Sequence, residues 1–320
     1  MEPVRRLTGQ AANLLISPDG ALSLVPFAAL VDERNRYLVE QFQFTYLTSG
    51  RDLLRLQDRA PSVEEPMILA DPDFGAPPAE RGRGSAARGF DLSKAVFTPL
   101  PASAEEAREI KTILPAAALM LGAQATEATI KQARSPRILH VATHGFFLED
   151  ENGGAAALEG RVLKQIGSSS PGEVNLDNPL LRAGLALAGA NLRKVGSEDG
   201  ILTAFEAAAL NLRGTKLVVL SACDTGVGEV KNGDGVYGLR RALTLAGAET
   251  QVMSLWPVSD KGTRDLMIEY YKALQSGQGR SDAMRQVQLQ MLKNPKREHP
   301  YYWASFIVSG EWANLDGTRD

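Results

Sequence analysis

From Met67 onward, the chain alternates short apolar runs with segments of helical periodicity, and this alternation restricts the possible folds most strongly. The apolar runs are expected strands, and they lie at 67–70, 117–121, 137–147, 216–222, 250–256 and 303–308. The expected helices lie at 103–114, 126–133, 200–210, 236–246, 261–275 and 281–292. Short strands that alternate with helices are typical of a mainly parallel sheet with helices on both faces. The sequence therefore predicts an α/β fold.

The first 60 residues follow another pattern and predict a strand-rich start. Apolar runs at 12–16 and 21–30 flank the turn signal Ser17-Pro18-Asp19-Gly20, which predicts a β-hairpin. Residues 37–47 alternate large apolar side chains with polar ones, as a half-buried strand does.

One helix start has a capping signature. Ser103 is followed three residues later by Glu106, and this spacing predicts a capping box at the beginning of the helix 103–114.

Two irregular segments, 71–89 and 149–173, interrupt the alternation and are rich in glycine, serine and proline. Long loops without secondary structure are uncommon in compact domains unless they serve a function, so we expect both to be mobile. The first is basic and is expected to be a solvated linker, with a cleavage or docking site as the alternative. The second follows His144 closely, so its ordering could complete or block a substrate groove.

Composition excludes several classes of protein. The 320 residues carry a net charge of −3, without the basic excess of a nucleic-acid-binding chain. The longest apolar runs are far shorter than the roughly 20 residues that cross a bilayer. The beginning of the chain has no signal-peptide pattern. We therefore expect a soluble protein of the cytoplasm, with no membrane association.

The counts of cysteine and histidine restrict the chemistry further. A single cysteine, Cys223, excludes a disulfide within the chain, and three histidines fit no zinc-site spacing, so a metal site is not expected. Neither a phosphate-binding glycine loop nor a serine nucleophile elbow occurs, so we expect no cofactor. His140 lies within an expected strand and is expected to be structural. His299 lies in a Glu-His-Pro turn and is expected at the surface.

Two expected strands end in residues that can do chemistry. The strand 137–147 delivers His144 and Gly145, and the strand 216–222 is followed by Cys223 and Asp224. Functional groups in open parallel sheets gather at the carboxyl ends of strands. A thiol beside an imidazole is an activated nucleophile, and the Gly145 N–H could stabilise an oxyanion. The residues alone leave a simpler interpretation open, because a free cysteine is often a small buried apolar residue.

Several longer motifs together resemble the CHAT domain, a caspase-like family of cysteine peptidases related to separases. They follow one another in the family's order, and the resemblance extends from about Leu14 to Trp312. The motifs are SPDGALSLVPFAAL, ILHVATHGFF, NPLLRAGLALAGAN, LVVLSACDTGVG, DGVYGLRRALTLAGAETQVMSLWPVSD and YYWASFIVSGEW.

The resemblance implies a caspase-like fold with a mainly parallel central sheet, preceded by a degenerate N-terminal β-rich half. Residues 1–60 would be the strand-rich part of that half, and residues 61–320 the caspase-like protease domain. Family members usually carry helical repeats, often of the TPR type. The resemblance therefore also implies a TPR-type regulatory partner, or repeats upstream of this chain.

The resemblance further implies a cysteine endopeptidase that cleaves a protein partner. Cys223 would be the nucleophile and His144 the proton-transfer residue of a Cys/His dyad, with the N–H groups of Cys223 and Gly145 holding the oxyanion. Two other interpretations stay open: a non-catalytic protein-interaction module on the same scaffold, and an acyltransferase or other thiol-dependent enzyme.

The expected specificity is for a basic residue, and it rests on Asp260. The segment 254–260 is a further strand end, where a carboxylate could pair with a cationic substrate side chain. The matching stretch of separases supplies the acid that receives arginine at the cleaved position. Asp260 could instead cap the helix that follows it. Asp224 is the second candidate for contact with a basic substrate side chain.

Overall fold

The computed structural model describes residues 8–76, 95–147, 179–181, 183–192, 198–221, 223–224, 234–256 and 260–318. In these ranges no helix is long and apolar enough to cross a membrane. The segment 149–173 and most of 71–89, for which mobility is predicted, lie outside the described residues.

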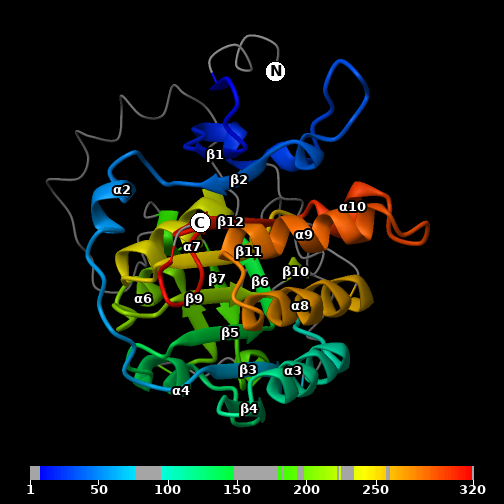
Figure 1. Ribbon diagram of the computed structural model, residues 1–320. Coiled ribbons are helices and arrows are strands. Elements are labelled where there is room, and N and C mark those ends of the chain that lie inside the picture. Colours follow the sequence, from blue (N-terminus) through cyan, green and yellow to red (C-terminus); the bar gives the residue numbers. More distant parts are fainter. Residues whose placement is uncertain are drawn as a thin grey trace, which may run out of the picture.

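A large sheet runs from the top to the bottom of Figure 1, and within the described residues it has eight strands. In their order across the sheet they are β1 (Asn13–Ile16), β2 (Gln43–Tyr46), β12 (Phe306–Gly310), β11 (Thr250–Ser254), β9 (Leu217–Leu220), β5 (Ile138–Ala142), β3 (Met67–Pro72) and β4 (Ala118–Gly122). Neighbouring strands are parallel, apart from the antiparallel pair of β11 and β12. The predicted mainly parallel sheet is confirmed.

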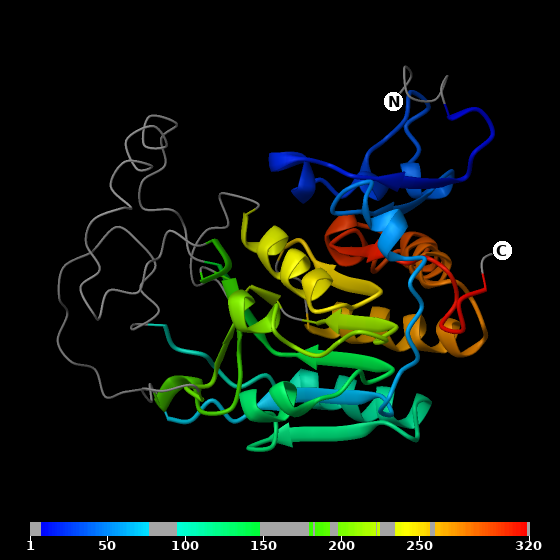
Figure 2. The ribbon, with the colours of Figure 1, turned by 90° about the vertical axis from the view of Figure 1, so that its left-hand side faces the viewer.

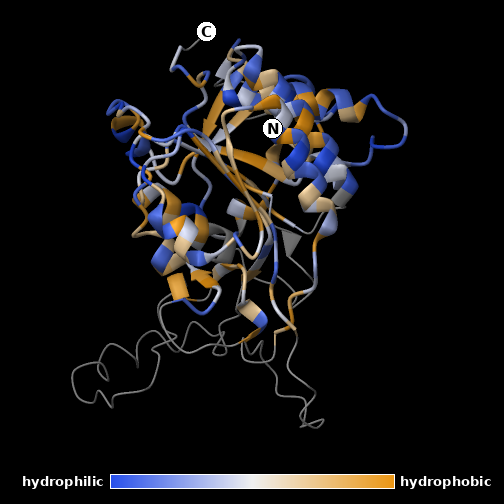
Figure 3. Ribbon diagram, turned by 90° about the horizontal axis from the view of Figure 1, so that it is seen from below, coloured by the Kyte–Doolittle hydropathy of each residue, from blue (hydrophilic) through white to orange (hydrophobic). Residues whose placement is uncertain are grey.

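Helices cover both faces of this sheet, as predicted. One apolar cluster joins the sheet to α3 (Pro101–Ile113), α8 (Asp260–Gln275), α9 (Arg280–Leu292) and α10 (Pro300–Trp303). A second cluster joins the other face to α4 (Glu127–Gln132), α6 (Ala204–Ala207) and α7 (Asp234–Leu245). The central strand β9 reads LVVL and is buried along its whole length, because helices cover both of its faces. Figure 3 shows the apolar strands between helices whose outer sides are polar.

A smaller sheet continues from the carboxyl ends of β5 and β9. Its described strands, in order, are β10 (Cys223–Asp224), β6 (His144–Phe147), β7 (Ala183–Ala186) and β8 (Ile201–Thr203). The sequence predicts one strand over 137–147, but the structure divides it at Thr143 into β5 and β6. An apolar run cannot show this division, because both parts are buried.

The predicted hairpin at the beginning of the chain is wrong. β1 pairs in parallel with the distant β2, and the second apolar run forms the 3₁₀ helices η1 (Gly20–Leu24) and η2 (Phe27–Ala29). Pro26 lies within that run and has no N–H to donate to a strand ladder, which explains why no return strand forms there. Of the predicted strand 37–47, the first part is the 3₁₀ helix η3 (Leu38–Glu40), and β2 forms the second. Figure 2 shows β1 and β2 at one edge of the sheet, far from β3 and β4.

The predicted capping box at Ser103 is also wrong. α3 begins two residues earlier, at Pro101, and its N-cap Leu100 makes no side-chain cap. Proline suits the first helical position because its missing N–H has no partner there. The Ser103 hydroxyl donates to the Leu100 carbonyl and accepts from the Asp71 N–H. Glu106 points into the protein and is buried.

Smaller differences concern segments that mix two kinds of structure. The predicted helix 200–210 begins as the strand β8 and continues as the short helix α6. The predicted strand 303–308 begins at the end of α10 and becomes β12. The remaining described elements are the 3₁₀ helices η5 (Pro179–Leu181) and η6 (Ala190–Leu192) and the helix α2 (Asp52–Arg55), which links the N-terminal strands to β3.

Candidate active site

His144 and Cys223 lie side by side on neighbouring strands. In the main sheet Val141 on β5 is the register partner of Leu220 on β9. Three residues later on both strands, His144 on β6 is the register partner of Cys223 on β10. The register is therefore unchanged across the break between the two sheets. Neighbouring strands lie about 4.8 Å apart, so the backbones of these two residues are close enough for their side chains to meet. The Cys223 side chain itself lies outside the described part of the structure.

The imidazole of His144 is 1% exposed. It is held by residues that follow β3 in the chain. Its Nε2 lies 2.6 Å from the carbonyl oxygen of Thr98. Its ring stacks on Phe74, with centroids 5.1 Å apart, and on Phe97, at 5.9 Å. These contacts fix both the position and the plane of the ring.

The contact with Thr98 also decides which nitrogen carries the hydrogen. A carbonyl oxygen can only accept a hydrogen bond, so Nε2 must donate. In the neutral ring Nδ1 is then the unprotonated nitrogen.

Asn191 fixes the segment that covers His144. Its side-chain oxygen accepts from the Phe97 N–H at 2.9 Å, and its Nδ2 donates to the carbonyl oxygens of Phe97 at 2.8 Å and Gly75 at 3.0 Å. Asn191 is buried, and it follows β7 of the smaller sheet. The segment 95–100 is thus pinned to the same small sheet that carries His144.

The other residues singled out in the sequence have varied positions. Gly145 is the register partner of Asp224, directly after the pair of His144 and Cys223. Asp260 is the first residue of α8, one residue earlier than the predicted helix start, and its side chain lies outside the described part. His299 is exposed and its Nδ1 accepts from the Tyr301 N–H, which confirms its predicted surface position.

His140 is fully buried, as predicted, but its partners are polar. Its Nδ1 lies 3.1 Å from the Tyr271 hydroxyl, and its Nε2 lies 3.2 Å from Oε1 of Glu106. Burial raises the pKa of Tyr271 well above its usual range, so its hydroxyl stays protonated beside Nδ1. The roles of Glu106, Thr98 and Asn191 were not predicted, because each contacts its partner across a long separation in the chain that no local pattern shows.

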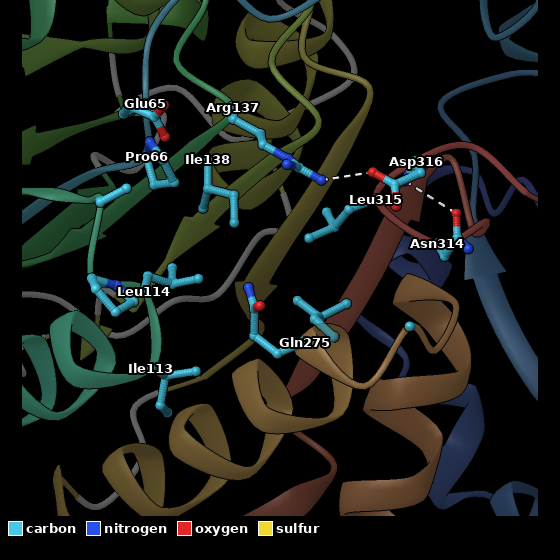
Figure 4. A pocket seen from close by; sticks show the side chains of 14 residues that line it. Glu65, Pro66, Ile113, Leu114, Arg137, Ile138, Gln275, Asn314, Leu315 and Asp316 are labelled. Atoms are coloured by element: carbon cyan, nitrogen blue, oxygen red, sulfur yellow. Dashed lines mark hydrogen bonds and ion pairs between the residues drawn. The ribbon is translucent and has the colours of Figure 1, made fainter.

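A cavity of about 290 Å³ lies next to the amino ends of β3 and β5, at the opposite end of the strands from His144 and Cys223 (Figure 4). Arg137 and Asp316 form an ion pair of 2.7 Å at its rim, and its floor is formed by apolar side chains such as Ile113 and Leu114. It contains none of the residues singled out above. Within the described residues, no group of three or more His, Cys, Asp or Glu side chains is placed to hold a metal ion.

Comparison with known proteins identifies the family of the chain. The family model of the CHAT domain matches residues 1–311. The chain belongs to the CHAT domain family. The resemblance inferred from the sequence motifs is thereby confirmed.

A curated relative of this CHAT domain is tetratricopeptide repeat protein 28 of Homo sapiens, which is 24% identical over 325 residues. The match covers 96% of this chain but 12% of the relative, so the CHAT chain corresponds to a small part of that protein.

Two solved structures are similar in fold. The Arg-specific cysteine proteinase gingipain R matches with a TM-score of 0.53 and 10% identity, covering 98% of this chain and 67% of its own. Separase from Saccharomyces cerevisiae, in complex with securin, matches with a TM-score of 0.46 and 13% identity, covering 90% and 14%. The match to gingipain R confirms the predicted caspase-like fold.

Proposed function

We propose that this CHAT domain is a cysteine endopeptidase with Cys223 as nucleophile and His144 as proton-transfer residue. The observation that carries the proposal is the register pairing of these two residues at the carboxyl ends of adjacent parallel strands. The residue that carries the chain's single thiol is thus paired, backbone to backbone, with a residue whose imidazole is buried and held by hydrogen bonding and stacking. The likeness to a cysteine proteinase adds support by analogy of fold alone.

The reaction follows from the tautomer of His144. Proton transfer from the Cys223 thiol to Nδ1 gives a thiolate and an imidazolium. The thiolate attacks the scissile carbonyl carbon, and the N–H groups of Cys223 and Gly145 hold the oxyanion. As the C–N bond breaks, Nδ1–H protonates the leaving amine and a thioester remains. Water then attacks the thioester carbonyl carbon, with Nδ1 accepting a proton from it. The C–S bond breaks, the carboxylic acid product leaves, and the proton on Nδ1 returns to the thiolate.

The substrate we propose is a protein cleaved after a basic residue. Asp260 and Asp224 supply the candidate carboxylates: Asp260 begins α8, and Asp224 directly follows the nucleophile. A carboxylate that meets an arginine side chain forms a charge-assisted and often bidentate contact, which favours Arg over uncharged residues.

We propose a helical-repeat segment of the TPR type as regulator, either upstream in the same polypeptide or on a separate chain. The name of the human relative indicates that such repeats occur together with a similar domain. The division into residues 1–60 and 61–320 and the cytoplasmic location stay predictions.

A second candidate function is a non-catalytic interaction module on the caspase-like scaffold. The observation that favours it is the burial of His144, which Phe74 and Phe97 stack against and leave 1% exposed. In this case the imidazole serves only to fix the segment 95–100 to the smaller sheet.

Thiol reactivity and cleavage mapping distinguish the two functions. A dyad makes the parent thiol react with iodoacetamide at about pH 7 at least tenfold faster than that of His144→Ala, because an ordinary thiol is only a few per cent ionised there. Mass-spectrometric mapping in a cell lysate then compares the parent chain with Cys223→Ala, with Arg or Lys expected before the new cleavage sites. Equal thiol reactivity in parent and His144→Ala, together with no cleavage, would establish the interaction module.

A further inference from the structure

A buried carboxylate lies between the two strands that lead to His144 and Cys223. Glu106 projects from α3 and is 3% exposed. One of its oxygens, Oε2, accepts a hydrogen bond of 3.2 Å from the Ser221 hydroxyl. The other, Oε1, lies 3.2 Å from His140 Nε2, which is an ion-pair distance without hydrogen-bond alignment. One side chain therefore contacts the middle of β5 and the residue that directly follows β9.

The two partners of Glu106 precede His144 and Cys223 in the chain, one in each of the two segments that lead to the pair. His140 lies on β5, four residues before His144. Ser221 directly follows β9 and lies two residues before Cys223, and its N–H donates to the Val141 carbonyl on β5. Any shift of Glu106 would thus act on both strands just before they enter the smaller sheet.

Tyr271 closes the network from α8. Its hydroxyl lies 3.1 Å from His140 Nδ1, and the other ring nitrogen, Nε2, faces Glu106 at 3.2 Å. The path from Tyr271 through His140 and Glu106 to Ser221 connects α8, β5, α3 and the end of β9. Buried carboxylates are costly unless they are paired and hydrogen-bonded, so a site that keeps one needs both partners in place.

We propose that Glu106, through His140 and Ser221, positions the Cys223/His144 pair. Glu106 is a positioning residue, because it is not in contact with the reacting groups. The inference rests on the proposed function, since it assumes that the thiol and the imidazole work together. Without the network, we expect the strand ends to drift and the thiol to lose its activation, while the fold persists.

The single cysteine of the chain provides a direct test. The rate of alkylation by iodoacetamide at about pH 7, followed by intact mass spectrometry, reports the reactivity of Cys223 without any substrate. We expect Glu106→Gln and Ser221→Ala each to lower this rate about tenfold or more, because displacements near 1 Å already cost up to a hundredfold in catalysis. With a cleaved peptide, the same variants should lower kcat and leave KM unchanged.

Matched controls lie at the amino end of β11 and beside it on β12, at the opposite end of the strands from the Cys223/His144 pair. The Glu249 carboxylate pairs with Lys216 at 2.6 Å and with Arg280 at 3.3 Å. The Ser309 hydroxyl donates to the Tyr46 carbonyl at 3.0 Å. Glu249→Gln and Ser309→Ala remove comparable polar groups, so they should lower the thermal midpoint but leave the alkylation rate as in the parent.

The outcomes separate this inference from the proposed function. Parental alkylation rates in both Glu106→Gln and Ser221→Ala would overturn the inference, and so would an equal loss of rate in the two controls. If Glu106→Gln does not fold, Ser221→Ala decides alone. If His144→Ala is alkylated slowly while Glu106→Gln and Ser221→Ala are alkylated at the parental rate, the dyad stands and the positioning role of Glu106 is wrong. If the parent is alkylated no faster than His144→Ala, the dyad itself is wrong, and the positioning role falls with it.

Discussion

Asn191 binds Phe97 through both polar groups of its backbone, at 2.9 Å to the N–H and 2.8 Å to the carbonyl oxygen. This pair closes the segment 95–100 over His144, since the next residue, Thr98, accepts from the imidazole. The order of the imidazole therefore depends on one buried asparagine from a distant part of the chain.

Asn191→Ala should release this segment. It leaves the buried backbone groups of Phe97 without partners, so we expect a loss of about 3 kcal/mol in the free energy of unfolding. Urea denaturation measures this loss, and hydrogen exchange should rise at 95–100 but not in Leu217–Leu220. Asn294→Ala is the control, because its exposed side chain accepts only from the Lys296 N–H. A similar small effect of both changes would mean that the segment 95–100 is held by other contacts.

The fold and the dyad candidates could be predicted to a large extent from sequence. β5, β9 and β11 come from short apolar runs, a pattern typical of buried strands. Each strand begins within two residues of its predicted first residue. Because parallel strands align their carboxyl ends, the positions of His144 and Cys223 at those ends already indicated their proximity.

The parts that failed depend on contacts far apart in the chain. The turn signal after β1 predicted a local partner, yet the partner of β1 is β2, beyond three 3₁₀ helices. The spacing of Ser103 and Glu106 fits a capping box, but burial against His140 and Ser221 determines where Glu106 points. A single sequence holds no signal for either contact.

Specificity for a basic residue gives a second prediction. If Asp260 receives an arginine side chain, Asp260→Asn should lower kcat/KM for Arg peptides tenfold to a hundredfold, which corresponds to about 1.5–3 kcal/mol. The kcat/KM for peptides with an uncharged residue at that position should change little. The asparagine keeps most of the ability to support the start of α8. Peptide libraries with Arg, Lys or Gln at the cleaved position measure the change. Unchanged cleavage of Arg peptides would leave Asp224→Asn as the next variant to test.

Asp32 gives a prediction for pH dependence. The N–H of Arg36 first, then the N–H of Arg34, the Gln41 amide and the Arg36 side chain, lower the pKa of this carboxyl against the opposing effect of burial. A carboxyl with a lowered folded-state pKa stabilises the fold above its unfolded pKa, and this contribution is lost as the pH falls through the folded-state value.

Asp32→Asn should therefore be less stable than the parent by a constant amount above about pH 5, and the difference should shrink steadily below about pH 4. Urea denaturation of both proteins between pH 3 and pH 7 measures it. A difference that stays constant across this whole range would show that the charge of Asp32 contributes nothing.

Lys131 gives a fourth prediction, because three carboxylates share its ammonium group. Glu127 pairs with it closely, Glu206 lies at 3.0 Å and Glu198 at 3.8 Å. Lys131→Met leaves the buried Glu127 without this cation, so we expect a loss of about 3 kcal/mol in the free energy of unfolding. Adding Glu127→Gln to Lys131→Met should recover part of that loss. Strictly additive effects in this double-mutant cycle would contradict a coupled pair.

The place of β12 has a consequence for the order of folding during synthesis. β12 is formed by residues 306–310, yet it lies between β2 and β11. β1 reaches the sheet through β2, and β2 through β12, so neither can dock before these residues have been synthesised. The strands from β3 to β11 can assemble earlier, because their partners are synthesised before residue 255. β1 and β2 are synthesised before the other strands of this sheet but are among the last to join it, and until then their unpaired edges depend on chaperones or on their own short length to avoid aggregation.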